Sequence, residues 1–410
     1  MSGIFTRERF GRPQVVAAFL LLAFLAQCIW LVSRRSMSLP ADEVTRVVEG
    51  RNQWLGKSIA GTPSGKPAEE QSPDPELIHH LNEGYDRDHS PLWYLIASSS
   101  NVLFTRVLKL DPFRFWGWLA AFPFLVFGVL LGGSLWYVAR RLYGNAGGYV
   151  ALVLYCFSPG LIQPSALWFS QPESGAAWGT FGAIFTGIAV AHTLYAPREV
   201  ILWNWRRIIL LALSFALAVG SQFQLVVVVP LALLFMVYLA PTRRLAALVI
   251  WLAACVLSAA LIYAAYFFHP KVFCQGLAHA KFFPILWRAY LMPGAYQRAL
   301  LQLGQSSPAL LVAIPTAIVT YIAWPRTRYF GNTAPLIVAM LFLLLAIGTP
   351  HSSGLGFQLM AVPFLFVFVA GIATDLLESR NSGLVFACLA GVLGASAMWN
   401  LWSLIQAGPG

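Results

Sequence analysis

Long apolar runs separated by short, arginine-bearing loops make up the chain from about residue 115 onwards, and one further run lies near the N-terminus. An apolar run of about 20 residues can cross the hydrocarbon core of a bilayer as a helix. The pattern therefore predicts an all-α, polytopic membrane protein with about eleven spans. These are expected at 15–33, 115–139, 146–162, 174–195, 245–267, 308–324, 334–348, 357–377 and 383–405, with two more within 208–240, hinged near Ser221 and Gln222.

The arginines of the short loops predict how the chain threads the membrane. Three arginines lie between residues 7 and 12, before the first span, and Arg140 and Arg141 follow the second. Because such residues gather in cytoplasmic loops, we expect a cytoplasmic N-terminus and a first span retained as an anchor. Two long loops, 34–114 and 268–305, then lie outside. The Arg-rich loops and modest size suggest a bacterial inner membrane, with these loops in the periplasm.

Composition agrees with a single integral membrane domain over residues 1–410. The chain is 58% hydrophobic and 10% charged, and its mean hydropathy is +0.68. The net charge of +11 comes from basic residues spread over many loops, so no nucleic-acid partner is expected. Four of the five cysteines fall inside apolar runs, so no disulfide framework is predicted. The interiors of the spans are almost free of charge, which counts against a transporter.

The first outer loop holds most of the acidic groups of the chain. Ten of the sixteen Asp and Glu residues lie in its part between Ser33 and Pro91, and it opens with Asp42 and Glu43. The apolar spacing that follows, up to Leu55, predicts an amphipathic helix along the membrane surface. These two acids therefore either cap that helix or serve chemistry. Residues 61–76, rich in Pro, Gly and charge, are expected to be a flexible insert.

Two further polar segments strengthen the chemical interpretation. The stretch Asp88–Tyr94 (DHSPLWY) closes the first outer loop with an acid and a histidine. Glu173 stands where the fourth predicted span begins, on the same side of the membrane as Asp42. An ionisable group near membrane depth is costly and is a functional candidate. The plain alternatives are that Glu173 caps its helix and that His89 is a satisfied loop histidine.

In their order, these motifs resemble the GT-C glycosyltransferases, and within them the protein mannosyltransferase and aminoarabinose transferase group. The resemblance covers residues 15–195 and resumes weakly at 351–373. The chain departs from the family pattern in several places. The family usually has Pro where Ser90 stands and Asp where Glu173 stands. Its late loop often carries Lys or Arg, and this chain has His351 and Gln358 there.

The resemblance implies transfer of a sugar from a polyprenyl-phosphate donor to a lipid, glycan or protein acceptor, with inversion, at the outer membrane surface. Asp42 would be the catalytic base, and Glu43 would orient it or hold a divalent cation together with Glu173. Asp42 and Glu173 could hold a divalent metal ion, so their carboxylates are expected within roughly 10 Å of each other. The leaving phosphate needs cations more than it needs a general acid.

Several residues are candidates for binding this substrate. Each cation among them has a plain alternative as a lipid-headgroup contact, since membrane lipids surround the chain. The substrate-binding candidates are Asp88, His89, Lys271, Lys281, Arg288 and His351.

Two other functions stay open. A catalytically inactive GT-C-like subunit, serving as a scaffold or glycan-binding partner in a membrane complex, would also fit the departures at Ser90, Glu173 and Gln358. An acyltransferase or polymerase of envelope lipids would typically carry a His-Asp pair within a span, and no such pair is found.

Overall fold

The fold is known from a computed structural model, in which every regular element of the described residues is a helix. Residues 41–46, 108, 116 and 173 are described by their backbone alone. The described ranges are 12–34, 41–57, 86–109, 115–166, 173–195, 205–283, 285–349, 356–379 and 382–406.

Seven of the described helices are long and apolar enough to cross a membrane. A further pair, α14 (Pro293–Ser306) and α15 (Pro308–Ala323), is bent by 113° and makes an eighth candidate if it counts as one span. An all-α, multi-pass membrane protein is therefore confirmed, whereas the number of eleven spans stays a prediction. The seven are α2 (Pro13–Arg34), α6 (Trp116–Cys156), α8 (Glu173–Thr193), α12 (Arg244–Ala265), α16 (Phe330–Gly348), α17 (Phe357–Leu377) and α18 (Ser382–Gln406).

The helix α6 is in fact two antiparallel helices. Its backbone leaves the helical region at Gly144, where φ is 75° and ψ is −168°. Beyond this point the hydroxyl of Tyr155 donates to the carbonyl of Gly128. In one straight helix these two residues would lie about 40 Å apart, so the chain must fold back. The reversal falls just after Arg140 and Arg141, where the charge pattern predicts it.

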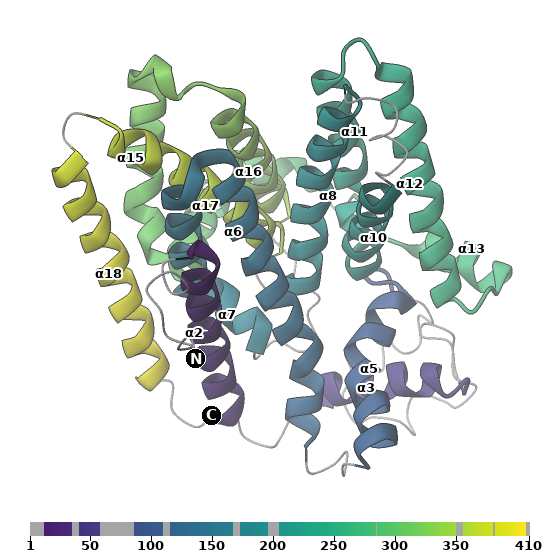
Figure 1. Ribbon diagram of the computed structural model, residues 1–410. Helices are drawn as coiled ribbons and strands as arrows, with labels where there is room; N and C mark the ends of the chain where they lie inside the picture. The colour runs from purple at the N-terminus through teal and green to yellow at the C-terminus, as the bar shows by residue number, and fades with distance from the viewer. Residues whose placement is uncertain are drawn as a thin grey trace, which may run out of the picture. The chain divides into compact units, whose positions relative to one another are not determined.

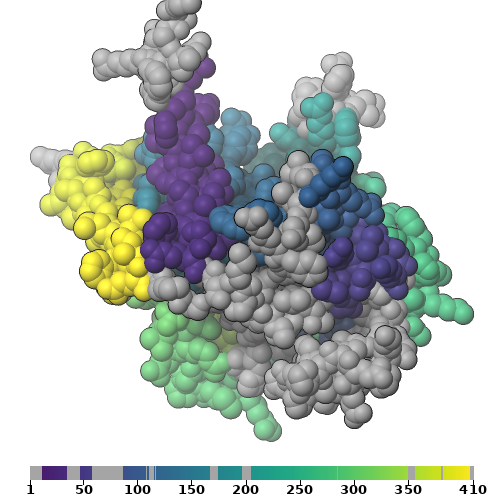
Figure 2. All heavy atoms as spheres, turned by 90° about the horizontal axis from the view of Figure 1, so that it is seen from below, coloured from purple at the N-terminus to yellow at the C-terminus, as the bar shows by residue number. Residues whose placement is uncertain are grey.

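The chain divides into two compact units. Unit 1 comprises Met1–Ser36, Leu125–Trp168 and Ile285–Gly410. At its centre is α17, which is buried without interruption from Phe357 to Thr374 because its sequence is apolar on every side. The terminal helices α2 and α18 lie side by side (Figure 2), and Asn400 donates to the side chain of Gln27 across them at 2.6 Å.

Unit 2 comprises Met37–Phe124 and Phe169–Pro284. Its core is a group of helices packed side by side (Figure 1), in which small residues allow close approach. A Cβ at Gly179 of α8 would lie 2.6 Å from the backbone nitrogen of Ala218. The core helices are α8, α10 (Trp205–Ser221), the short η2 (Phe223–Val227) with α11 (Val228–Leu239), and α12.

The helices α8 and α10 run antiparallel. Gly179 lies against Ala218. Ten residues further along α8, the carbonyl of Ala189 accepts from the Arg207 side chain of α10 at 3.1 Å. Extending this register places Glu173, the first residue of α8, level with the break between α10 and η2. The start of α8 therefore belongs to the same end of unit 2 as that break.

The helix predicted after Asp42 is present as α3 (Ala41–Trp54), and it lies against α5 (Pro91–Leu108) (Figure 1). The indole of Trp54 donates to the carbonyl of Leu95 at 2.8 Å. The amide of Gln53 donates to the carbonyl of Ala265, at the end of α12, at 3.0 Å. These polar contacts fix α3 against α5 and the end of α12 within unit 2.

The remaining elements are short. They are α7 (Pro159–Ala166), α13 (Pro270–His279), η3 (Trp287–Leu291) and η4 (Pro325–Thr327).

The contact between α3 and α5 depends on Gly50. A Cβ there would lie 2.3 Å from the backbone oxygen of Tyr94, so Gly50→Ala must push the two helices apart. We expect it to lower the free energy of unfolding by about 1–3 kcal/mol. Thermal unfolding in detergent measures this loss. Gly117→Ala is the matched control, because a Cβ at that helical glycine meets open space. Equal stability of both variants would contradict the close packing of α3 on α5.

Candidate functional site

The end of the first outer loop, residues 86–90, is fastened to the break between α10 and η2. The backbone N–H and the hydroxyl of Ser90 both donate to the carbonyl of Gly220, at 3.1 and 2.8 Å. The N–H of Phe223 donates to the carbonyl of Asp88 at 2.9 Å. The last carbonyls of a helix lack partners within the helix, and the loop end supplies donors for one of them. Ser90 is fully buried and also caps α5, since its hydroxyl accepts from Leu92 N.

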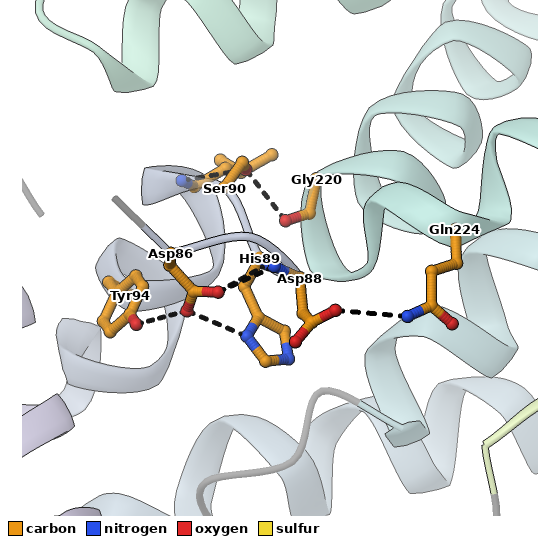
Figure 3. Close-up of polar contacts among 8 residues, drawn as sticks. Asp86, Asp88, His89, Ser90, Tyr94, Gly220 and Gln224 are labelled. Carbon is orange, nitrogen blue, oxygen red and sulfur yellow. Dashed lines mark hydrogen bonds and ion pairs between the residues drawn. The ribbon is translucent and has the colours of Figure 1, made fainter. Parts of the chain in front are cut away.

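Asp86 is the centre of a compact hydrogen-bond network (Figure 3). One carboxylate oxygen accepts from the backbone N–H groups of Asp88 and His89, at 2.8 and 3.1 Å. The other accepts from Nδ1 of His89 at 3.0 Å and from the hydroxyl of Tyr94 at 2.5 Å. Four donors thus hold the carboxylate in one orientation.

The same network determines the charge of Asp86. Burial raises its pKa, but the charge of His89 and the hydrogen bonds from His89, Tyr94 and the Asp88 N–H together outweigh burial and leave the pKa well below its usual range. Asp86 is therefore ionised at neutral pH and serves as a fixed negative charge beside His89.

The imidazole of His89 is held on two sides. Its Nδ1 bonds to Asp86, and its ring is stacked on Trp93 with centroids 5.1 Å apart and an interplanar angle of 29°. The side chain is 12% exposed. With Nδ1 engaged, Nε2 is the ring nitrogen left for a ligand or a proton.

Asp88 and Lys281 come to the same place. Gln224 of η2 donates to one carboxylate oxygen of Asp88 at 3.2 Å (Figure 3). The backbone N–H of Lys281 donates to the carbonyl of Arg87 at 2.7 Å, and the Lys281 side chain is exposed. Three of the predicted substrate-binding residues, Asp88, His89 and Lys281, are thus brought together within unit 2.

The other cationic candidates lie on other elements. Lys271 is exposed on α13 of unit 2, and Arg288 is exposed on η3, which belongs to unit 1. His351 lies outside the described residues.

The three predicted catalytic acids lie on described helices, but their side chains are outside what the structure describes. Asp42 and Glu43 stand in the first turn of α3, and Glu173 is the first residue of α8. The metal pair of Asp42 and Glu173 stays a prediction. Among the described residues, no group of three or more His, Cys, Asp or Glu side chains could hold a metal ion.

Sequence reasoning missed three members of this network: Asp86, Tyr94 and Gln224. An aspartate often accepts from the backbone N–H two residues later, so the spacing of Asp86 and Asp88 was a usable signal. For Tyr94, the signal was its position one turn into α5, the helix that directly follows the same loop. For Gln224, 136 residues from its partner, the sequence holds no signal.

Comparisons with known proteins give a fold. No protein-family model matches the chain, and no curated protein sequence matches it. Among solved structures, the crystal structure of the Archaeoglobus fulgidus oligosaccharyltransferase in complex with Zn and sulfate matches with a TM-score of 0.57 at 12% identity, over 94% of this chain and 53% of that one. Its apo form matches with a TM-score of 0.57 at 13% identity, over 95% and 56%.

A third structure from that organism agrees. The oligosaccharyltransferase AglB in complex with an inhibitory peptide and a dolichol-phosphate has a TM-score of 0.52 at 12% identity, over 94% of this chain and 55% of that one. The chain thus spans about half the length of these archaeal proteins. At such identities the likeness is one of fold, and the chain has the GT-C fold.

Two substitutions at position 90 test the attachment of the loop. Ser90→Ala removes one donor to Gly220 and the helix cap, and we expect a loss of about 1 kcal/mol in unfolding free energy. Ser90→Pro removes the N–H as well, so the loss should rise to roughly 2 kcal/mol or more. Thermal unfolding of both variants in detergent measures the order. A proline variant as stable as wild type would contradict the double hydrogen bond.

Proposed function

We propose that the chain is a membrane glycosyltransferase, which moves a sugar from a polyprenyl-phosphate donor to a lipid, glycan or protein acceptor at the outer face of the membrane. One observation carries the proposal. Within a GT-C fold, the end of unit 2 that holds the start of α8 also holds His89, fixed by an ionised Asp86, beside Asp88 and Lys281. Such a group of titratable side chains suits the recognition of a charged donor.

The acids of α3 and α8 supply the chemistry in this proposal. Asp42 removes the proton from the acceptor hydroxyl or amine, which then attacks the anomeric carbon with inversion. Glu43 orients Asp42 in this proposal. Glu173 completes the site, with Asp42, as a partner for a divalent metal ion.

The cations serve the leaving group. Cleavage leaves a polyprenyl phosphate, whose charge requires positive partners rather than a general acid. His89 and Lys281 are best placed for this role, since both belong to the network around residues 86–90. Lys271, Arg288 and His351 are further candidates from the two outer loops and the late loop.

Solved relatives of the fold support a lipid-linked donor. AglB was solved with a dolichol-phosphate, and the archaeal oligosaccharyltransferase was solved tethered to an acceptor peptide. For this chain the motif order favours the group of protein mannosyltransferases and aminoarabinose transferases. A bacterial inner membrane with a periplasmic site and a cytoplasmic N-terminus fits the distribution of arginines.

A second candidate function is a GT-C-like subunit without catalysis. Gln358 favours it, because the family often has a cation in this region and this amide is fully buried, donating to the carbonyl of Ala299 at 2.8 Å. A side chain used in this way packs the fold and leaves one fewer group for phosphate.

The catalytic proposal is tested by Asp42→Asn in the native cell. The substitution keeps the size and the capping oxygen but removes the base, so we expect protein levels to persist and one envelope glycan to disappear, as a loss of about 100-fold or more in transfer. Mass spectrometry of glycolipids, glycans and glycoproteins measures it. Glu49→Gln makes the same chemical change in the same helix and serves as the control.

The deletion strain separates the two functions. A glycan that is lost in both the deletion and Asp42→Asn supports the transferase. If the deletion alters a glycan that Asp42→Asn leaves intact, the chain acts as a scaffold.

A further inference from the structure

We propose that Asp86 is the positioning residue for His89: by accepting the Nδ1 proton, it makes Nε2 the nitrogen that meets a phosphate oxygen of the lipid-linked donor. The phosphate as ligand rests on the proposed function. The positioning role rests on the hydrogen bonds around Asp86 and on the charge of its carboxylate.

The carboxylate of Asp86 is itself immobilised. The backbone N–H groups of Asp88 and His89 donate to one oxygen. The hydroxyl of Tyr94, a residue near the start of α5, donates to the other. The loop that carries these donors is tied to Gly220 and Phe223 of unit 2. Asp86 is therefore held so that one carboxylate oxygen faces Nδ1 of His89 (Figure 3).

This geometry selects one tautomer. A neutral imidazole carries one proton, and an ionised carboxylate can only accept, so the proton must lie on Nδ1. The stacked ring of Trp93 prevents the imidazole from tilting away. When the ring gains its second proton, on Nε2, Asp86 balances the charge of the imidazolium. The Nε2 proton can then be donated to an anion.

The local charge suits a phosphate. The loop carries Asp86, Asp88 and Arg87, and Lys281 is joined to it through the Arg87 carbonyl. With His89 protonated, residues 86–90 and Lys281 together carry three positive and two negative side chains; this count leaves out the acids at the starts of α3 and α8. The side-chain amide of Gln224 also donates a hydrogen bond to one oxygen of Asp88, which limits the repulsion between Asp88 and an incoming anion.

The experiment uses the full chain in lipid nanodiscs, with ¹⁵N-labelled histidine, observed by NMR at alkaline pH. We expect the Nδ1–H form of His89 in wild type. In Asp86→Asn the oxygen of the amide keeps the two backbone donors, so its NH₂ group faces His89 and should convert the ring to the Nε2–H form. His269 and His279 are internal controls, since their Nδ1 atoms face the backbone carbonyls of Tyr266 and Gln275.

A titration then tests the ligand near neutral pH. Decaprenyl phosphate should shift the Nε2 resonance of His89 in wild type, and decaprenol, which lacks the phosphate, should not. In Asp86→Asn we expect the affinity for decaprenyl phosphate to fall about tenfold, as for the loss of one charged hydrogen bond.

The outcomes separate the two claims. A folded Asp86→Asn chain that keeps the Nδ1–H form overturns the positioning role. A tautomer switch without any response of wild type to decaprenyl phosphate overturns the phosphate as the ligand of His89, whereas the proposed function fails only if Asp42→Asn leaves the glycans unchanged. If Asp86→Asn does not fold, Tyr94→Phe decides. It keeps the carboxylate and should keep the Nδ1–H form, so an Nε2–H ring there would overturn the proposal.

Discussion

The site depends on a single attachment, the pairing of residues 88–90 with the break between α10 and η2. A helix that ends within a membrane protein leaves carbonyls that water cannot always reach, and an unpaired carbonyl there costs free energy. The N–H and the hydroxyl of Ser90 both donate to the carbonyl of Gly220. The N–H of Phe223 donates in turn to the carbonyl of Asp88. Because this pairing fixes the loop end, Asp86 can order His89, and Asp88 comes within reach of Gln224.

Much of the fold could be predicted from the sequence, because a span reveals itself by length and apolar content. The reversal of α6 at Gly144 follows the arginines before it, and α3 follows the amphipathic spacing after Asp42. The site was only partly predictable. The DHSPLWY motif pointed to Asp88 and His89, but Ser90 and Gly220 are 130 residues apart. Periodicity tells which face of a helix is buried and cannot tell which distant carbonyl needs a donor.

Two of the positions at which the sequence departs from the pattern it resembles have structural explanations. Ser90 supplies a donor pair to Gly220 that a proline could not, so the substitution belongs to the way this loop is anchored. Gln358 holds Ala299 of α14 in the packing of unit 1. The first departure therefore weighs little against the proposed catalysis, and the second places a buried amide in the packing of unit 1. In the proposed function, His89 with Asp86 and Lys281 supplies the groups that meet the phosphate.

The central claim, that the loop end of unit 2 receives the phosphate of a lipid-linked donor, is tested most directly by cryo-electron microscopy of the chain in nanodiscs with decaprenyl phosphate. We expect density for the phosphate within hydrogen-bond distance of Nε2 of His89. Phosphate density at another place in the molecule, with His89 free of any ligand, would contradict the claim.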